Sequence, residues 1–221
     1  MTLAQACRYH QINRFLFAST CSVYGQGNAI LDEVSPLNPV SLYARSKIES
    51  EKAILSLADG NFAPTILRMS TLHGLSPRMR FDLVVNIFAL KSTLEKKIKI
   101  FGGNQWRPLL HVEDAADAFI KCLEAPIEAV RSQVFNVGSS EQNFRILELG
   151  KIVQEIIPGT ELDIEADNNS DPRDYRVSFA KIESVLGFKP QKTIHQSLHE
   201  IHTAIKNNTF PDLTHPRYYN S

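Results

Sequence analysis

Tyr43 and Lys47 lie four residues apart in the segment "YARSK". Residues at this spacing share one face of a helix. A lysine ammonium favours the ionised form of a neighbouring phenol, so this pair would let Tyr43 act as a general acid or base near neutral pH. An exposed tyrosine and lysine on a solvated helix face would give the same pattern, and the two residues alone do not separate these interpretations.

Thr20 offers a third reactive group. It belongs to "FLFASTCSVYG", residues 15–25, which begins as an apolar run typical of a strand covered on both faces and ends in hydroxyls, a thiol and a glycine. Side chains at the carboxyl ends of such strands face the ligand crevice of open α/β sheets. The Thr20 hydroxyl could therefore hydrogen-bond a substrate carbonyl or alcohol while Tyr43 moves a proton. The alternative is that these hydroxyls only stabilise a turn.

Ser41 is suited to cap the helix that carries Tyr43 and Lys47, and we expect this helix to run to about Leu57. The other expected helices are Thr2 to Gln11, a helix capped by Asp82 and ending near Lys97, a helix starting near Glu113, and the segments RILELGKIVQEII, FAKIESVLG and TIHQSLHEIHTAIK. The expected strands are Phe15 to Ala18, APTILRM, KIKIF, QVFNVG and ELDIEA. A polar stretch connects the first strand to Ser41, and the pattern loosens beyond Gly74 into "LSPRMRFD".

Strands that alternate with helices predict an α/β fold with a parallel sheet. The smaller, mixed elements beyond residue 75 predict a lobe packed beside that sheet. We therefore expect residues 1–75 to form one unit that carries the catalytic residues, and residues 76–221 to form mainly a substrate-binding lobe. The segment QVFNVG could return to the main sheet.

Composition narrows the class of partner. The 221 residues contain 24 basic and 24 acidic side chains, so the formal net charge is zero and no footprint for nucleic acid or an anionic membrane is expected. The three cysteines, Cys7, Cys21 and Cys122, are widely spaced and are expected to be reduced packing thiols. The chain shows neither a spanning apolar stretch nor a signal peptide, which favours a cytoplasmic protein with a small-molecule or protein partner.

Five segments in this order resemble one known family. The segments are FLFASTCSVYG, SPLNPVSLYARSKIESE, LRMSTLHG, RPLLHVEDAADAF and FNVGSS. Together they resemble the extended short-chain dehydrogenase/reductases, in particular the NAD-dependent epimerase/dehydratase group that acts on nucleotide sugars, and the resemblance extends to about Pro190. It implies a doubly wound, Rossmann-like sheet with a substrate lobe, NAD or NADP as cofactor, a nucleoside diphosphate sugar as substrate, and often a homodimer.

The resemblance assigns a role to each matching residue. Thr20 matches the catalytic Ser/Thr, Tyr43 the proton-transfer tyrosine, and Lys47 the lysine that also holds the nicotinamide ribose. Ser70 matches a residue whose backbone meets the nicotinamide. The residues implied on the substrate side are Thr71, Asp82, Leu83, Arg107 and Arg173.

Some of these substrate-side residues suit a diphosphate and one of them, Asp82, does not. An arginine fork suits a diphosphate, and a helix N-terminus offers it free N–H groups. The alternative for Arg107 and Arg173 is a surface ion pair. Asp82 at a helix N-terminus would serve as a cap but would repel a phosphate.

The pair Cys21 and Ser22 departs from part of the family. Members that dehydrate sugars resemble one another in having Asp-Glu directly after the catalytic threonine, where it protonates and expels a hydroxyl. A thiol and an alcohol are poor substitutes for that acid. The residues therefore favour epimerisation or carbonyl reduction over dehydration.

The start of the chain departs further. In the family, about a hundred residues precede the strand that matches Phe15 to Ala18, and they carry the glycine-rich turn that binds the dinucleotide. The ten glycines here contain no GxGxxG, and the one GxG, at Gly25 and Gly27, leads into an acidic loop. We expect an N-terminally truncated chain whose first strand becomes an edge strand. Two hypotheses remain: an epimerase or reductase completed by a separate N-terminal half, and a catalytically inactive nucleotide-sugar-binding or interaction module.

Overall fold

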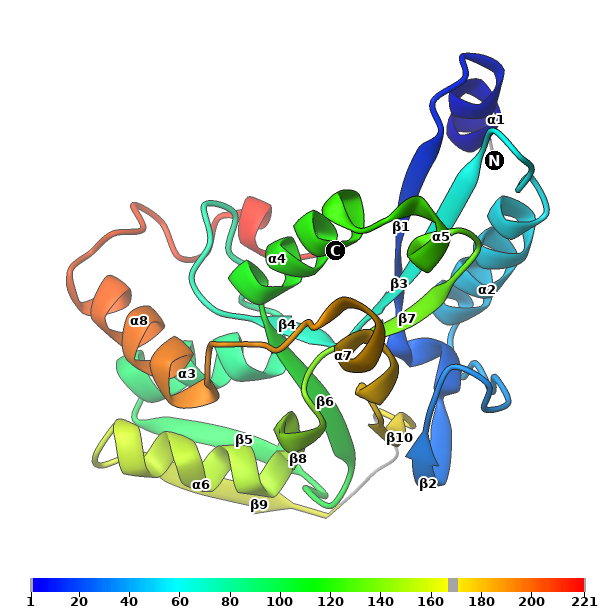
Figure 1. Ribbon diagram of the computed structural model, residues 1–221. Helices are drawn as coiled ribbons and strands as arrows, with labels where there is room; N and C mark the ends of the chain where they lie inside the picture. Colours follow the sequence, from blue (N-terminus) through cyan, green and yellow to red (C-terminus); the bar gives the residue numbers. More distant parts are fainter. Residues whose placement is uncertain (1, 167–170, 221) are drawn as a thin grey trace.

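The computed structural model describes residues 2–166 and 171–220, and its main sheet is parallel (Figure 1). This sheet has the order β1-β3-β7, with β1 at Arg14–Thr20, β3 at Ala63–Met69 and β7 at Val134–Val137. Every residue of β3 is buried. The segment QVFNVG therefore contributes a strand, β7, that pairs with β3 although about 65 residues separate them in the chain. The α/β fold with parallel strands is as the sequence predicts.

The apolar run of β1 contacts both faces of the sheet but is less buried than the sequence predicts: Phe15 to Phe17 are half-buried and Ala18 is exposed. Phe15 and Phe17 pack in one cluster with residues of α1 (Thr2–Tyr9) and α2 (Leu42–Leu55). Leu16 packs in another cluster, which includes residues of α4 (Val112–Glu124). Within the described residues, β1 pairs only with β3 and lies at the edge of the sheet.

Further strands form three smaller sheets. β2 (Gln26–Leu31) pairs in parallel with β10 (Asp174–Val177), and β5 (Lys97–Phe101) pairs in parallel with β9 (Glu161–Glu165). β6 (Trp106–His111) lies between β4 (Thr71–His73) and β8 (Asn143–Arg145). The chain thus continues from β3 through Ser70 into β4, and in this way links the main sheet to the second region.

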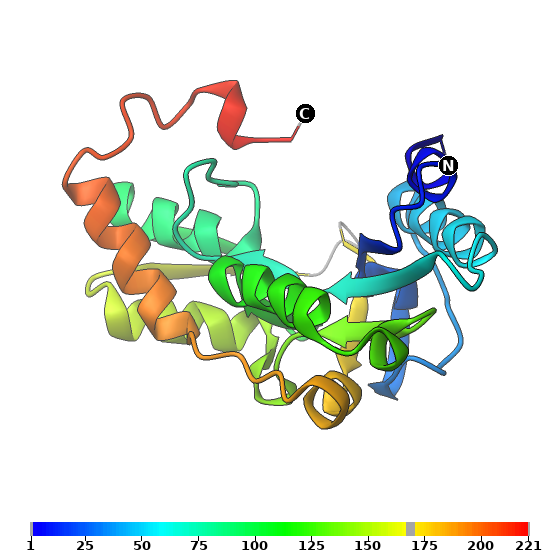
Figure 2. The same ribbon diagram turned by 45° about the horizontal axis from the view of Figure 1, so that its top comes forward.

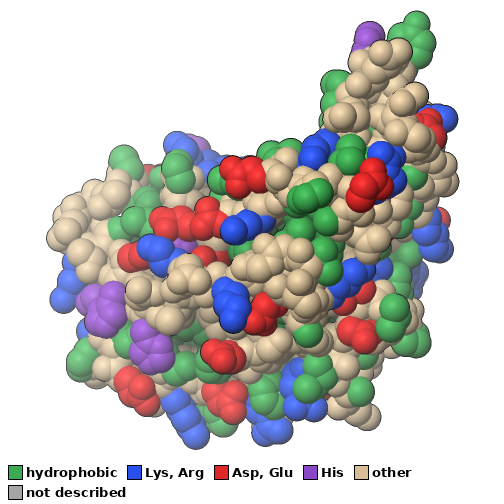
Figure 3. All heavy atoms as spheres, in the orientation of Figure 1, with side chains coloured by type: hydrophobic (Ala, Val, Ile, Leu, Met, Phe, Trp, Pro, Cys, Tyr) green, Lys and Arg blue, Asp and Glu red, His purple; other side chains and the backbone are tan. Residues whose placement is uncertain are grey.

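Helices α3 (Val84–Leu94), α6 (Ile146–Ile156) and α8 (Ile194–Lys206) gather around β5 and β9, at the opposite end of the molecule from α1 and α2 (Figure 2). The remaining helical segments are α5 (Ile127–Val130), α7 (Ala180–Leu186) and 3-10 turns at Cys21–Tyr24, Ser140–Gln142 and Pro216–Tyr218. Acidic and basic side chains are interspersed over the face seen in Figure 3. No helix in the two described ranges is long and apolar enough to cross a membrane.

Three expectations about local structure are wrong. The polar connection before Ser41 contains strand β2, whose residues are mostly exposed and which forms through its pairing with the distant β10. Asp82 does not cap α3: the cap position is Leu83, without a side-chain hydrogen bond, because Arg80 occupies both oxygens of the Asp82 carboxylate at 2.7 Å. This helix also ends earlier, at Leu94, so that β5 can begin at Lys97.

Candidate functional site

A cleft of about 620 Å³ opens at the carboxyl ends of β1 and β3, where ligands of parallel α/β sheets bind. A second cavity of about 360 Å³ adjoins it, and both are lined by Thr71, Leu83 and Arg173. The larger cleft is also lined by the predicted residues Thr20, Tyr43, Lys47 and Ser70, and the smaller cavity by Asp82 and Arg107. The fold therefore brings all nine predicted site residues to two adjoining cavities.

Helix α2 carries Tyr43 and Lys47 and begins at a capped end, because Ser41 Oγ accepts a hydrogen bond from the Ala44 amide at 3.1 Å. Lys47 Nζ donates to the Ala18 carbonyl at 2.8 Å and lies 5.8 Å from the centroid of the Tyr43 ring. Partial burial lowers the pKa of Lys47, while the nearby charge of Glu51 opposes that shift. The side chain is thus fixed to β1, with its ammonium also 4.6 Å from the centroid of the Phe17 ring.

The Tyr43 side chain itself is not fixed by hydrogen bonds. The residue is 55 % exposed, and its hydroxyl has no hydrogen-bond partner among the residues that the structure describes. A group that must give and take a proton needs a free oxygen of this kind.

Thr20 and Ser70 close the base of the cleft. Thr20 Oγ1 accepts from the Ser22 amide at 3.1 Å, so the turn chemistry considered for the sequence is present, while the Thr20 O–H can still donate to a ligand. The amide and the hydroxyl of Ser70 both donate to the Val137 carbonyl, at 3.0 and 2.9 Å. A backbone contact from Ser70 to a ligand would therefore have to come from its carbonyl.

Arg107 and Arg173 meet at Asp171 in the smaller cavity. Arg107 is only 4 % exposed, pairs with Asp171 at 2.7 Å and donates to the carbonyls of Trp106 and Arg173. Arg173 binds both oxygens of Asp171, at 2.8 and 2.6 Å. Burial raises the pKa of Asp171, but hydrogen bonds and charge from the two arginines outweigh burial and hold this pKa below its usual range. Arg107 is thus buried, whereas Asp171 and Arg173 are partly exposed. The trio keeps a net positive charge.

The first turn of α3 lies beside this trio. Leu83 and Val84 line the smaller cavity, and the helix lacks a side-chain cap, so its first N–H groups remain available to an anion. Asp82 also lines the cavity, yet its charge is paired with Arg80. The phosphate repulsion expected from Asp82 is thereby reduced.

Several cleft residues were not identified from the sequence. They are Ser22, His73, Asn86, Arg78 and Arg80. The larger cleft is lined by four cations, including Lys47 and Arg173, and by no carboxylate of the described residues. Among the residues that the structure describes, Arg78 forms no ion pair and donates only to the Arg217 carbonyl, at 3.3 Å. In the sequence, the two closely spaced arginines of "SPRMRF" could have indicated that this loop adds positive charge to a site.

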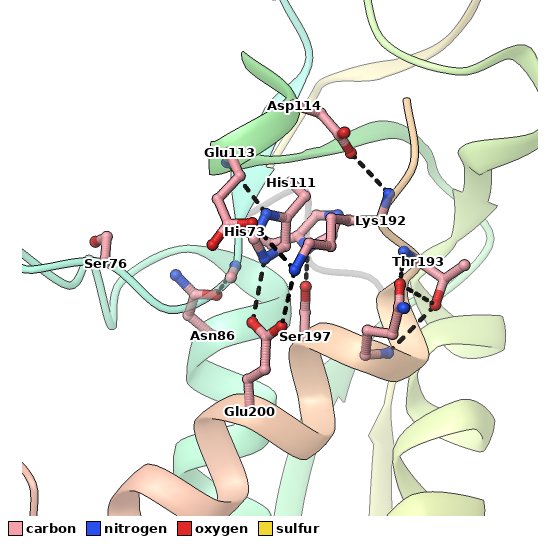
Figure 4. Close-up of polar contacts among 12 residues, drawn as sticks. His73, Ser76, Asn86, His111, Glu113, Asp114, Lys192, Thr193, Ser197 and Glu200 are labelled. Carbon is pink, nitrogen blue, oxygen red and sulfur yellow. Dashed lines mark hydrogen bonds and ion pairs between the residues drawn. The ribbon is translucent and has the colours of Figure 1, made fainter. Parts of the chain in front are cut away.

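Two histidines lie beneath the cleft, at paired positions of β4 and β6 (Figure 4). His73 Nδ1 is 2.8 Å from Ser197 Oγ of α8, and His73 Nε2 has no partner in the described part of the chain. Burial, together with the neighbouring His111, lowers the pKa of His73 to about 3. His73 is therefore neutral at physiological pH.

His111 connects the same strands to α4 and α8. Its Nδ1 accepts from the Glu113 amide at 3.1 Å, which places the ring proton on Nε2, facing Glu200 at 3.3 Å. Lys192 bridges Glu113 and Glu200 at 3.0 and 3.5 Å. Figure 4 shows these side chains converging from three segments, which fixes the lobe against the base of the cleft.

Cys21 and Ser22 occupy the positions discussed for dehydration. Cys21 is buried, its thiol donates to the Arg68 carbonyl at 3.1 Å, and burial raises its pKa far above the usual range. Ser22 lines the cleft, with its hydroxyl 3.3 Å from that of Tyr175. Neither side chain is a carboxylic acid that could protonate a leaving hydroxyl. The described residues also contain no group of His, Cys, Asp and Glu that could hold a metal ion.

Comparison with known proteins gives a consistent family. The family model of the NAD-dependent epimerase/dehydratase family matches residues 1–138. An uncharacterized UDP-glucose epimerase, YtcB of Bacillus subtilis, is 31 % identical over 156 residues, which is 70 % of this chain and 48 % of that protein. A UDP-glucose 4-epimerase of Lactobacillus helveticus is 30 % identical over 212 residues, covering 86 % of this chain and 63 % of the relative. The chain thus spans about half to two thirds of the length of these relatives.

Solved structures share the fold. The UDP-glucose 4-epimerase of Thermotoga maritima, determined with UDP-glucose, superposes with a TM-score of 0.82 at 22 % identity over 94 % of this chain and 68 % of that one. MoeE5, determined with UDP-glucuronic acid and NAD, gives a TM-score of 0.81 at 24 % identity over 93 % and 69 %. At these identities the likeness establishes the Rossmann-type fold.

Proposed function

Because the chain belongs to the NAD-dependent epimerase/dehydratase family, we propose that its cleft binds a nucleoside diphosphate sugar and epimerises it with NAD as cofactor. One observation carries this proposal. Thr20, Tyr43 and Lys47 meet at one end of the adjoining cavities, and the Arg107–Asp171–Arg173 trio lies at the other. A sugar placed between them has its diphosphate near the cations and a ring hydroxyl near Tyr43.

The protein residues would handle the proton. Tyr43, as the phenolate beside the Lys47 ammonium, takes the proton from a sugar hydroxyl and, as the phenol, later returns it. The Thr20 O–H donates to the same sugar oxygen and holds it in place. Bound NAD would supply the hydride acceptor and donor. Lys47, Tyr43 and the Ser70 carbonyl fit the nicotinamide-ribose end of that cofactor, because they place polar groups in one part of the cleft.

A UDP-sugar is the substrate class that the comparisons support, since the Lactobacillus helveticus relative is named a UDP-glucose 4-epimerase and MoeE5 was determined with UDP-glucuronic acid. Arg78, which has no carboxylate partner among the described residues, adds a cation to the larger cleft. A sugar that itself carries a carboxylate would neutralise this charge. We therefore place UDP-glucuronic acid ahead of UDP-glucose. Epimerisation or carbonyl reduction is favoured over dehydration because Cys21 and Ser22 provide no acid.

The test mixes the protein with the N-terminal half of a related epimerase as a separate chain, NAD and either UDP-sugar, and follows the sugar by proton NMR. We expect the 4-epimer to form, faster from UDP-glucuronic acid. Isothermal titration with UDP and with each UDP-sugar measures binding separately. Binding without turnover, even at millimolar NAD, would contradict the proposal and favour a catalytically inactive nucleotide-sugar-binding module.

A further inference from the structure

The loop between β4 and α3, residues 74–83, carries Arg78 and Arg80 to the larger cleft. We call it the arginine loop. It contains no helix or strand, and Arg78 is exposed. Backbone that lacks regular hydrogen bonding opens readily unless other contacts hold it. The place of the two guanidinium groups at the cleft therefore depends on what the loop packs against.

The segment that follows α8, residues 207–220, lies beside the arginine loop (Figures 1 and 2). The Phe81 amide donates to the Tyr218 carbonyl at 2.9 Å. In the other direction, the Arg217 guanidinium donates to the Pro77 carbonyl at 3.4 Å, across 140 positions of the sequence. The loop and the segment are thus joined by hydrogen bonds from both sides.

Aromatic rings form the centre of this contact. Phe81 is fully buried and Tyr218 is 6 % exposed. The Phe81 ring centroid lies 5.7 Å from that of Tyr218 and 5.4 Å from that of Phe210, both edge to face, a geometry that stabilises aromatic pairs beyond their burial. The Tyr218 hydroxyl has no hydrogen-bond partner among the described residues, so its ring makes the contact.

The same segment reaches the cleft at Asn220. This residue lines the larger cleft, and its amide donates to the Asp82 carboxylate at 3.4 Å. Asp82 in turn holds Arg80 through both of its oxygens. Both arginines of the loop are therefore connected to the segment, Arg78 through the Arg217 carbonyl and Arg80 through Asp82.

We propose that Tyr218 is a positioning residue: its ring fixes Phe81 and thereby holds the arginine loop against the larger cleft. Phe81 directly follows Arg80, so a displacement of the Phe81 ring moves the guanidinium groups relative to the cleft. The consequence for a substrate rests on the proposed function, in which Arg78 favours a sugar that carries a carboxylate. The position of the loop itself can be measured without any ligand.

Amide hydrogen exchange, followed by NMR, measures how firmly the loop is held. In Tyr218→Ala, the exchange rate of the Phe81 amide should rise about tenfold or more, because the carbonyl that accepts its hydrogen bond loses its anchor. The Ser70 amide, which donates to the Val137 carbonyl in the main sheet, should keep the parent rate. Tyr218→Phe keeps the ring and should match the parent at both amides.

Three results would overturn the proposal. An unchanged exchange rate of the Phe81 amide in Tyr218→Ala would show that the ring does not hold the loop. An equal rise at Ser70 would mean a general loss of stability, and a raised rate in Tyr218→Phe would mean that the hydroxyl is the anchor. Thermal unfolding checks the fold, and Tyr218→Leu replaces Tyr218→Ala if the latter does not fold.

Calorimetric titration tests the link to the substrate separately. The affinity of Tyr218→Ala for UDP-glucuronic acid should fall about tenfold, while its affinity for UDP-glucose, which has no carboxylate, stays that of the parent. If neither sugar binds the parent, the proposed function fails, and the exchange rate of the Phe81 amide still decides the role of Tyr218. Raised exchange with unchanged binding of both sugars would support the role of Tyr218 and contradict the preference for UDP-glucuronic acid.

Discussion

The two ends of the site hold their functional groups in opposite ways. Tyr43 is half exposed, and its hydroxyl has no hydrogen-bond partner in the described residues. Arg107 is buried and already bonded to Asp171 and two backbone carbonyls. A group that exchanges a proton must be free to form a new hydrogen bond, whereas a group that orients a diphosphate binds better when it is fixed beforehand.

The buried polar groups that support the two ends of the site also differ in kind. Behind Tyr43, a charged pair, Glu51 and Arg68, has its hydrogen bonds satisfied. On the side of the lobe, the buried groups are the imidazoles of His73 and His111, and His73 Nε2 lacks a partner in the described ranges. Charge is thus buried behind the helix that carries Tyr43. The two histidines link β4 and β6 to α8 through Ser197 and Glu200.

The largest effect is expected from Tyr43→Phe, which removes the proton-transfer group and leaves the arginine end intact. Turnover should fall by about 10² or more, while the affinity for the nucleotide sugar stays the same. NMR rates and titration calorimetry measure the two quantities. Tyr9→Phe, on the exposed face of α1, is the matched control. Near-full turnover of Tyr43→Phe would remove the catalytic role from this residue.

Arg107→Lys tests the opposite end. Lysine keeps the charge but loses the fork that binds Asp171 and the carbonyls together, so the affinity for UDP should drop about tenfold. Calorimetric titration with UDP measures the change. Arg8→Lys, in an exposed pair with Asp59, is the control that should bind as the parent does. Equal affinity of the parent and Arg107→Lys would show that the Arg107–Asp171–Arg173 trio serves the fold only.

His73 should make stability depend on pH on the lobe side. Its pKa of about 3 in the folded state lies below the usual value, so the unfolded chain binds the proton first as pH falls. The free energy of unfolding is unaffected by His73 above about pH 6.5. Below that pH it falls toward pH 3, by up to about 1.4 kcal/mol per pH unit, because the unfolded chain takes up the proton that folded His73 does not. Urea unfolding of the parent and of His73→Asn measures it.

The His73→Asn variant should lose stability less steeply than the parent over this range of pH. His10→Asn, at an exposed position beyond α1, should keep the parent slope. Parallel curves for the parent and His73→Asn would mean that His73 is charged in the folded protein.

The smallest effect concerns the start of α2. Ser41→Ala removes the hydroxyl that caps the Ala44 amide, and we expect the free energy of unfolding to fall by about 1 kcal/mol. Ser56→Ala, at the other end of the helix, should change it much less, because Ser56 Oγ only donates to the Ala53 carbonyl. Chemical denaturation compares the two. Equal losses would mean that the cap does not set the stability of this helix.

The amino-acid sequence predicts this protein best where the determinants are local. The helix of Tyr43 and Lys47 follows from a capping serine and a helical spacing. The strand β1 follows from three consecutive apolar residues, although these are only half-buried. The alternation of such segments predicts the parallel α/β fold. Local signals of this kind therefore suffice to place the site residues on their elements, while the catalytic and binding roles of these residues are proposals.

Only the tertiary structure decided the pairings between distant segments. Glu51, for example, binds Arg68 of β3 rather than Lys47 of its own helix, because the fold brings the guanidinium within hydrogen-bond distance. β2 forms because β10, well over a hundred residues later, offers its backbone groups. Local sequence sets the conformations that each segment prefers, but a buried charge or an unpaired strand takes the partner that the assembled fold brings to it, since leaving either without one costs more than any local preference provides.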